Sequence, residues 1–286
     1  MTTPEIMSDY SYTHNGSILR INNVSLSFPK DDGSEFQVLR NVTAEIKNVV
    51  RPNMQQGQVI GLLGPSGVGK TQLFRILAGL AIPGAKMSGQ VFMGDQDTPV
   101  QPGFVGVVAQ HYPLFAHRTV RSNLLVAGRG TPKDVAQRAD ALLQEFELTG
   151  HAEAYPAQLS GGQRQRVAIA QQMMSHEYFL LMDEPFSGLD PVMSGRVIEL
   201  IERVTCQNEF NTTIIVTHDI GSAIAVSDTL WVLGRDRGVD GKIIPGAYIK
   251  RVYDLAAMGL AWRPGIRKDP KFATLSNELR DLFPML

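Results

Sequence analysis

The sequence of 286 residues predicts an α/β fold with a mostly parallel β-sheet, an antiparallel β segment ahead of it and a helical insertion within it. Three observations support this prediction. Short apolar runs that suit buried parallel strands alternate with amphipathic helical segments. Evenly spaced apolar residues precede the first of these runs, which is typical of an antiparallel pair. Between about residues 111 and 158 strand patterns are absent, and a helical pattern replaces them.

Composition and charge limit the classes of protein to consider. Hydrophobic residues make up 43% and charged residues 19% of the chain, as in an ordinary globular protein. The net charge is −1, so we expect no nucleic acid partner. A single cysteine cannot form an internal disulfide, which indicates a reducing compartment. Because the sequence shows no targeting pattern and no run of about eighteen apolar residues, we expect a cytoplasmic location with membrane contact only through partner subunits.

The N-terminal part is predicted as a polar leader followed by two antiparallel strands. After a turn at Asn15-Gly16, apolar residues alternate from Leu19 to Phe28. The alternation resumes from Phe36 to Ile46 beyond a turn at residues 29–34. Residues 48–56 have the character of a loop without an evident purpose.

A glycine-rich loop between a strand and a helix is the centre of the sequence. An apolar run ends at Leu63, and apolar residues at helical spacing follow from Leu73 to Leu80. The residues between match G-x-x-x-x-G-K-[ST], which identifies a phosphate-binding loop when it stands in this context. The loop comprises Gly64, Pro65, Ser66, Gly67, Val68, Gly69, Lys70 and Thr71, and Gln72 follows it. The alternative is a glycine-rich turn with a solvated lysine, which the flanking strand and helix make much less attractive.

These residue types suit a nucleoside triphosphate. Glycines allow successive backbone amides to face an anion at a helix N-terminus. Lys70 offers a cation to the β- and γ-phosphates, and the Thr71 hydroxyl offers a ligand to the Mg²⁺ that bridges them. We therefore expect this loop to bind a nucleotide.

The rest of the chain alternates strands and helices. Asp190-Pro191 has the sequence of a helix start. Strands are predicted at residues 90–93, 104–108, 178–182, 212–217 and 229–233, and helices near residues 135–146, 191–204, 220–226 and 272–283. The apolar stripe of the last helix is expected to pack on the core rather than on a partner.

Two acidic residues follow a buried strand. Asp183 and Glu184 come directly after Phe179-Leu-Leu-Met182, at the strand end where open α/β sheets bind ligands. Asp183 suits Mg²⁺, and Glu184 suits the orientation and polarisation of an attacking water. The alternative is a solvated acidic pair without a role, which is difficult to reconcile with a phosphate loop in the same chain.

A second anion site is predicted at residues 159–163, Leu-Ser-Gly-Gly-Gln. Ser160 can cap the helix that follows, while Gly161 and Gly162 leave its N-terminus free of side chains. This is the most specific pattern in the sequence.

These motifs together resemble the nucleotide-binding subunit of an ATP-binding cassette (ABC) transporter, over about residues 18–234. The resemblance implies a P-loop NTPase core, a helical subdomain at about 111–165, and an extension at 235–286 that follows the ABC ATPase domain. In this family, Gly64 to Thr71 would be the Walker A loop, 159–163 the signature and 179–184 the Walker B strand. The resemblance is closest to the nitrate, sulfonate and taurine importers.

The resemblance also implies roles for individual residues. Gln110 matches the Q-loop glutamine, a metal ligand, and Phe28 the aromatic residue that stacks on adenine. His218 matches the switch histidine that contacts the γ-phosphate, although a lone histidine after a strand is usually structural. Asp190 lies in the D-loop. Gln72 departs from the usual Ser or Thr, which affects only a secondary contact to the α-phosphate.

Such subunits work as head-to-tail dimers, so ATP on one subunit would be covered by Ser160, Gly161, Gly162 and Gln163 of the other. The partner would be a second copy or a paired ABC subunit. The resemblance further implies transmembrane permease subunits that contact residues 111–123, and a solute-binding protein in the complete system. The predicted activity is ATP hydrolysis that energises a bacterial solute importer, at the inner face of the cell membrane.

A soluble ABC ATPase that acts on DNA or ribosomes is the alternative. Those relatives usually carry coiled-coil arms, zinc modules or two cassettes in one chain. This sequence has one cassette, no heptad arm and no cysteine cluster. Transport is therefore the preferred hypothesis.

Overall fold

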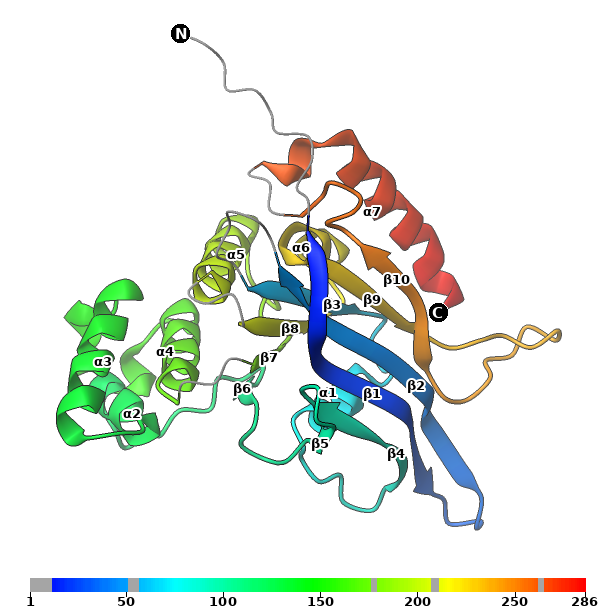
Figure 1. Ribbon diagram of the computed structural model, residues 1–286, viewed down its shortest axis with the longest axis horizontal. Helices are drawn as coiled ribbons and strands as arrows, with labels where there is room; N and C mark the ends of the chain where they lie inside the picture. The colour runs from blue at the N-terminus through cyan, green and yellow to red at the C-terminus, as the bar shows by residue number, and fades with distance from the viewer. Residues whose placement is uncertain (1–11, 51–56, 176–178, 207–210, 262–264) are drawn as a thin grey trace, which may run out of the picture.

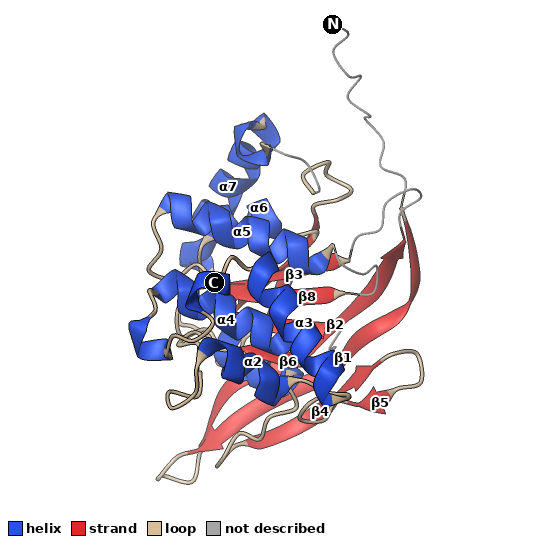
Figure 2. Ribbon diagram, turned by 90° about the vertical axis from the view of Figure 1, so that its left-hand side faces the viewer, coloured by secondary structure: helices blue, strands red, loops and turns tan. Residues whose placement is uncertain are grey.

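The computed structural model describes residues 12–50, 57–175, 179–206, 211–261 and 265–286. It has two sheets (Figures 1 and 2). One face of the larger sheet packs with a helix against the smaller sheet, and further helices cover its other face. The larger sheet has the strand order β10-β9-β3-β8-β7-β6, in which β10 is antiparallel and the other five are parallel. The predicted α/β class with a mostly parallel sheet is confirmed.

The strands of this larger sheet are short and largely buried. Their bounds are β3 Gln58–Leu63, β6 Gly106–Val108, β7 Phe179–Asp183, β8 Thr212–Thr217, β9 Thr229–Gly234 and β10 Tyr248–Asp254. All six residues of β3 are buried, because both faces of the sheet are covered. Tyr178, predicted in the β7 strand, lies outside the described residues.

The smaller sheet is antiparallel, with the order β2-β1-β4-β5. Its strands are β1 Thr13–Pro29, β2 Glu35–Val50, β4 Lys86–Met93 and β5 Thr98–Pro99. The predicted N-terminal antiparallel segment is confirmed. Figure 1 shows it lying across one side of the larger sheet.

Three details of the N-terminal prediction were wrong. The predicted turn at Asn15-Gly16 lies inside β1, where a shift in register accommodates Gly16 at a φ of 63°. Residues 48–50, predicted as loop, extend β2 and pair with His14 and its neighbours, while 51–56 lie outside the described residues. The strand predicted at residues 90–93 begins earlier, at Lys86, because the register shift between Asn22 and Ser25 bends the ladder without ending it.

Seven α-helices surround the larger sheet in the described part of the chain. They are α1 Lys70–Leu77, α2 Val120–Ala127, α3 Pro132–Glu145, α4 Gly161–Met173, α5 Pro191–Thr205, α6 Ile220–Val226 and α7 Pro270–Leu282. Short 3₁₀ turns occupy Thr149–His151, Pro156–Gln158, Ile266–Lys268 and Phe283–Met285. Asp190 caps α5 by accepting hydrogen bonds from the Val192 and Met193 amides at 2.8 and 3.0 Å, as its sequence position predicts.

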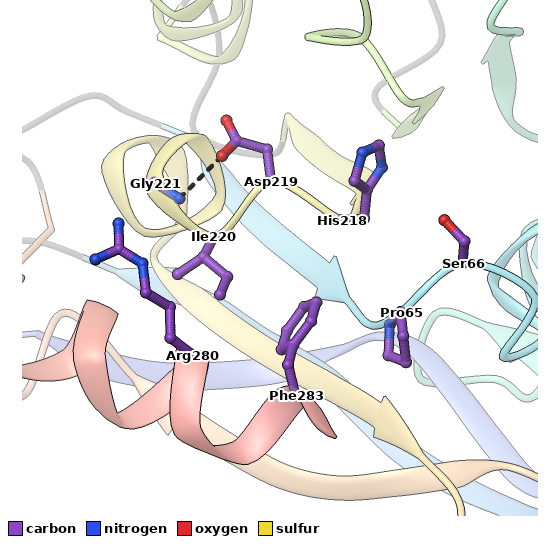
Figure 3. A pocket seen from close by; sticks show the side chains of 8 residues that line it. All are labelled: Pro65, Ser66, His218, Asp219, Ile220, Gly221, Arg280 and Phe283. Atoms are coloured by element: carbon purple, nitrogen blue, oxygen red, sulfur yellow. Dashed lines mark hydrogen bonds between the residues drawn. The ribbon is translucent and has the colours of Figure 1, made fainter. Parts of the chain in front are cut away.

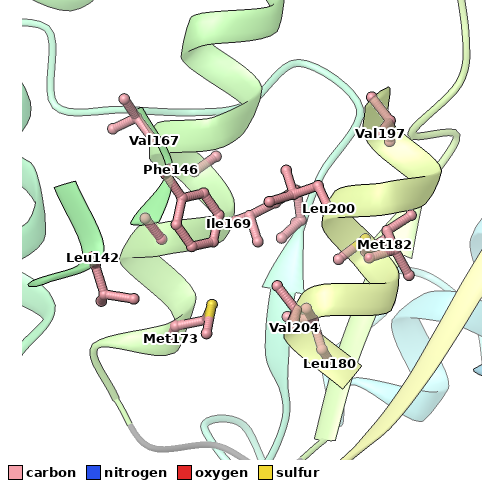
Figure 4. Close-up of a cluster of buried hydrophobic side chains, with 14 of the residues drawn as sticks. Leu142, Phe146, Val167, Ile169, Met173, Leu180, Met182, Val197, Leu200 and Val204 are labelled. Atoms are coloured by element: carbon pink, nitrogen blue, oxygen red, sulfur yellow. The ribbon is translucent and has the colours of Figure 1, made fainter. Parts of the chain in front are cut away.

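Helices α2, α3 and α4 form the helical region seen at the left of Figure 1, and its apolar side chains continue into those of the sheet. Leu142, Phe146 and, in α4, Ile169 belong to one cluster, which also includes Met182 of β7 and Leu200 of α5 (Figure 4). The helical region therefore shares one hydrophobic cluster with the core.

The segment after residue 234 packs near the edge formed by β10 and β9, on the same face of the larger sheet as α6. Leu275, Leu279 and Leu282 of α7 are buried in a cluster with α6 and β9, so the predicted packing of this helix on the core is confirmed. Strand β10 was not predicted, because its sequence YIKRVYD forms an edge strand with exposed charged residues rather than an apolar run. Among the described residues, no helix combines the length and apolar character needed to cross a bilayer.

Candidate functional site

The phosphate-loop motif lies between β3 and α1, as predicted. Parallel pairing of β3 with β8 and β9 sets the loop at the carboxyl edge of the sheet. A Cβ on Gly64 would lie 2.8 Å from the Leu233 carbonyl oxygen, so only glycine allows β9 to pass this close. The first turn of α1 begins at Lys70, where backbone amides have no acceptor within the helix.

Lys70 is buried inside its own loop. Its Nζ donates hydrogen bonds to the carbonyl oxygens of Gly64 at 2.8 Å and Pro65 at 3.2 Å. The same nitrogen lies 3.7 Å from Oε1 of Glu184. Burial lowers the pKa of Lys70, while the carboxylates of Glu184 and Asp183 act in the opposite direction. A cation is thus held at the loop, next to two acidic groups from another strand.

Glu184 is fixed from several sides. Its amide donates to the Val216 carbonyl at 2.8 Å, and its backbone φ is 50°. Its carboxylate accepts a hydrogen bond from Thr217 Oγ1 at 3.2 Å and lies 2.9 Å from Nδ1 of His218. The structure therefore brings together Lys70, Glu184 and His218, which are far apart in the sequence.

Thr217 was not singled out from the sequence. Its hydroxyl also accepts a hydrogen bond from the Asp219 amide at 3.1 Å, so it links the Glu184 carboxylate to the segment that carries His218. Its position directly before His218, at the end of a buried strand, is the signal that could have identified it.

Asp183 ends β7 beside Glu184. Burial raises the pKa of Asp183, the neighbouring Glu184 raises it further, and Lys70 opposes both effects. Mg²⁺ prefers oxygen ligands. The Asp183 carboxylate, whose negative charge is disfavoured by burial, and the hydroxyl of the exposed Thr71 are ligands of this kind. These residues fit a divalent cation.

The signature residues form the N-terminus of α4. Ser160 Oγ accepts a hydrogen bond from the Gln163 amide at 3.2 Å, and Gln163 Oε1 accepts one from the Ser160 amide at 2.8 Å. This reciprocal pair is a capping box. Gly161 has open space around it, whereas a Cβ on Gly162 would lie 2.9 Å from the Met193 methyl group.

A glutamine links the signature helix to the acidic strand end. Gln165 is 1% exposed, and its Nε2 donates a hydrogen bond to the Pro185 carbonyl at 3.0 Å. The helix that begins at Ser160 is thereby tied to the residue next to Glu184. The sequence alone did not reveal this contact.

The other predicted site residues lie at separate positions. Gln110 is exposed in the turn after β6, and Phe28 is half-buried near the end of β1. Phe28 packs against the cluster that includes Val68 of the phosphate loop. Gln72 is half-buried, and among the described residues its Oε1 has no hydrogen-bond partner.

A pocket of about 480 Å³ adjoins the phosphate loop (Figure 3). Pro65 and Ser66 border it on one side, and His218 lies across from them. Residues 219–221 continue the wall beyond His218, and Arg280 and Phe283, from α7 and the turn after it, also line the pocket. The extension after residue 234 thus reaches the edge of the candidate nucleotide site.

Comparison with known proteins agrees with the motifs. The family model described as "ABC transporter" matches residues 48–187. The sulfate/thiosulfate import ATP-binding protein CysA of Gloeobacter violaceus is 40% identical over 223 residues, which cover 76% of this chain and 60% of that protein. The CysA protein of Brucella melitensis is 41% identical over 214 residues, or 71% of this chain and 56% of that protein.

The chain carries an ABC transporter ATPase domain. Its ABC fold is also that of the dimeric cassette MJ0796 bound to ADP and Pi, with a TM-score of 0.62 and 25% identity, covering 83% of this chain and 99% of that one. The protein cbiO1 of Clostridium perfringens, part of the transporter complex cbiONQ, has a TM-score of 0.66 at 22% identity, covering 93% and 100%. The chain thus spans 56–60% of the length of the two curated CysA relatives.

Proposed function

We propose that this ABC chain binds and hydrolyses ATP to energise a membrane transporter, a bacterial solute importer whose permease is a separate subunit. The observation that supports this most is the convergence of Lys70, Glu184 and His218 at the phosphate loop. The import names of the relatives support the direction of transport.

The chemistry assigned to each residue follows from its position. Lys70 binds the β- and γ-phosphates, while Thr71, Asp183 and Gln110 hold Mg²⁺, which supplies charge neutralisation for the phosphates when bound. Glu184 orients and polarises the attacking water, and His218 keeps its carboxylate aligned. Phe28 stacks on the adenine ring.

A second copy, or a paired ABC subunit, completes the site. Ser160 to Gln163 make their contacts with their own helix, with His151 and near Met193, all within the helical region and α5. The exposed N-terminus of α4 is therefore available to cover nucleotide held by the opposite subunit. Asp190, at the start of α5, lies at the same dimer contact.

The permease is proposed to contact the segment at residues 111–123. Asn123 is fully buried, and its side chain bonds to the backbone of Phe115, Arg118 and Thr119, so the segment has a fixed shape. Phe115 remains 46% exposed on it, which suits an apolar contact with a short permease helix.

The transported solute is proposed to carry an oxyanion group. The relatives described here are named for sulfate and thiosulfate, and the sequence resemblance was to importers of nitrate, sulfonates and taurine. All of these solutes carry an oxyanion. A solute-binding protein in the complete system would supply the selectivity.

Purification from the native cell tests this proposal. The chain would be tagged, membranes solubilised gently, and the copurified proteins identified. Recovery of a polytopic permease, with ATP hydrolysis by the complex that an oxyanion and its binding protein stimulate, would support the importer. Recovery of ribosomes or salt-sensitive binding to DNA would instead support the soluble alternative.

A further inference from the structure

Arg235, in the extension after residue 234, forms a hydrogen bond with the phosphate loop. This residue directly follows β9, whose Leu233 carbonyl lies against Gly64. Its Nη2 donates a hydrogen bond to the Gly67 carbonyl oxygen at 2.7 Å. The proposed function assigns no role to Arg235, and the sequence pattern did not single it out.

The backbone of Arg235 is held from two sides. Its amide donates to the Leu286 carbonyl at 2.8 Å, and its own carbonyl accepts a hydrogen bond from Lys250 Nζ at 3.1 Å. Leu286 is buried against Gly234, where a Cβ would lie 2.5 Å from a leucine methyl. The arginine therefore extends from a fixed point between β10 and the segment 283–286.

Gly67 is a position where the peptide orientation matters. Its φ is 75°. The Gly67 carbonyl and the Val68 N–H form one planar peptide group. That amide makes only a long hydrogen bond, of 3.4 Å, to the Pro65 carbonyl. A charged donor on the carbonyl fixes the plane of this peptide and thereby the shape of the loop.

The guanidinium of Arg235 does not form an ion pair with the neighbouring Asp236. Asp236 pairs instead with Arg40 at 2.8 Å and Lys250 at 3.4 Å. A positive charge thus stands at the outer side of a loop that, under the proposed function, surrounds a triphosphate. Over distances shorter than the Debye length of about 10 Å, such a charge favours an anionic ligand.

From these contacts we infer that Arg235 is a positioning residue of the phosphate loop. The extension after residue 234 holds Arg235 against the Gly67 carbonyl and thereby raises the affinity of the loop for ATP. This inference rests on the proposed ATP binding. It gives the extension a role in phosphate recognition that the motifs of the ABC domain do not include.

Arg237 provides a matched control. It carries the same charge two residues away, and its Nη2 donates to the Pro284 carbonyl at 2.9 Å while its Nη1 donates to Gly241 at 3.2 Å. It therefore binds the same tail segment, and both of these hydrogen bonds lie away from the phosphate loop. Arg237→Met removes one charge and one tail contact without removing the hydrogen bond to Gly67.

The test compares the unmodified chain, Arg235→Met, Arg235→Lys and Arg237→Met by equilibrium dialysis with radiolabelled ATP and by competition with inorganic tripolyphosphate. We expect Arg235→Met to weaken binding of both ligands about tenfold, as loss of a charged hydrogen bond does. The kcat at saturating ATP should stay within about twofold. Arg235→Lys should be intermediate, and Arg237→Met should bind like the unmodified chain.

Melting temperatures without nucleotide separate a folding defect from a loop defect. Arg235→Met and Arg237→Met should have similar melting temperatures. If Arg235→Met fails to fold, the loss of ATP affinity in Arg235→Lys must still exceed the loss in Arg237→Met. Equal affinity in Arg235→Met and the unmodified chain would overturn the inference alone. Failure of the unmodified chain to bind ATP would overturn the proposed function as well.

Discussion

Replacing Glu184 with glutamine tests the role assigned to its carboxylate with little change in shape. Glutamine keeps an oxygen that can accept the hydrogen bond now donated by Thr217 at 3.2 Å. It loses the charge that lies 3.7 Å from Lys70 Nζ and 2.9 Å from His218 Nδ1. The perturbation therefore removes a base while leaving the loop and its lysine in place.

The expected magnitude differs between hydrolysis and binding. A positioned general base contributes about 10²- to 10⁴-fold, or about 3–5 kcal/mol in the barrier, so kcat should fall by that factor. At about 4 Å, two unit charges attract by about 4 kcal/mol at an effective dielectric constant of about 20. Since nucleotide phosphates compete with Glu184 for Lys70, the variant should bind ATP at least as tightly as the unmodified chain.

Phosphate release under saturating ATP measures the first effect, and equilibrium dialysis with ATP measures the second. Size-exclusion chromatography with ATP should show a trapped dimer, because the nucleotide stays bound between the subunits. Lys70→Ala serves as the contrast, since it should lose ATP binding itself. Turnover by Glu184→Gln within a few-fold of the unmodified chain would refute the role of Glu184 as the base.

Three further changes test other parts of the structure. Ser160→Ala removes the cap of α4 and should lower the free energy of unfolding in urea by about 1 kcal/mol. Thr131→Ala removes the corresponding cap of α3 and should cost as much, but it should leave ATP-driven dimerisation intact. An equal loss of dimer in both variants would contradict the role of residues 159–163 in the dimer. Asp183→Asn should raise the melting temperature without nucleotide at pH 8 and abolish most hydrolysis. Because the folded-state pKa of Asp183 is raised, its charge destabilises the protein fully above that pKa and not at all below the lower pKa of the unfolded state. The gain should therefore shrink as pH falls between the two values, and a constant gain would contradict this cause. Phe146→Ala should lower the free energy of unfolding by about 3–5 kcal/mol in urea titrations, and a loss under 1 kcal/mol would show that the cluster collapses around the gap.

Elements with a strong local signal were predictable from the sequence. The buried run of β3, the helix start at Asp190-Pro191 and the loop from Gly64 to Thr71 each depend on neighbouring residues only, and the structure has them where expected. Strand β10 carried no such signal, because an edge strand that pairs on one side needs no apolar run.

Contacts between distant segments were not predictable. Motif order indicated that Lys70, Glu184 and His218 act together, but not that Thr217 would hold the carboxylate or that Gln165 would bind Pro185. Arg235 reaches Gly67 only because β9 lies beside β3 in the sheet, and no local pattern encodes that neighbourhood. The roles given to Phe28 and Gln110 stay predictions.

The hydrophobic cluster shared by the helical region and the sheet has a consequence for folding cooperativity. Helix α4 continues to Met173, past the predicted subdomain limit at residue 165, and its buried residues belong to the same hydrophobic cluster as those of α3 and β7. A fragment of residues 111–165 would expose Leu142 and Phe146 to water and should not fold alone. The helical region and the sheet should therefore unfold together in a single cooperative transition.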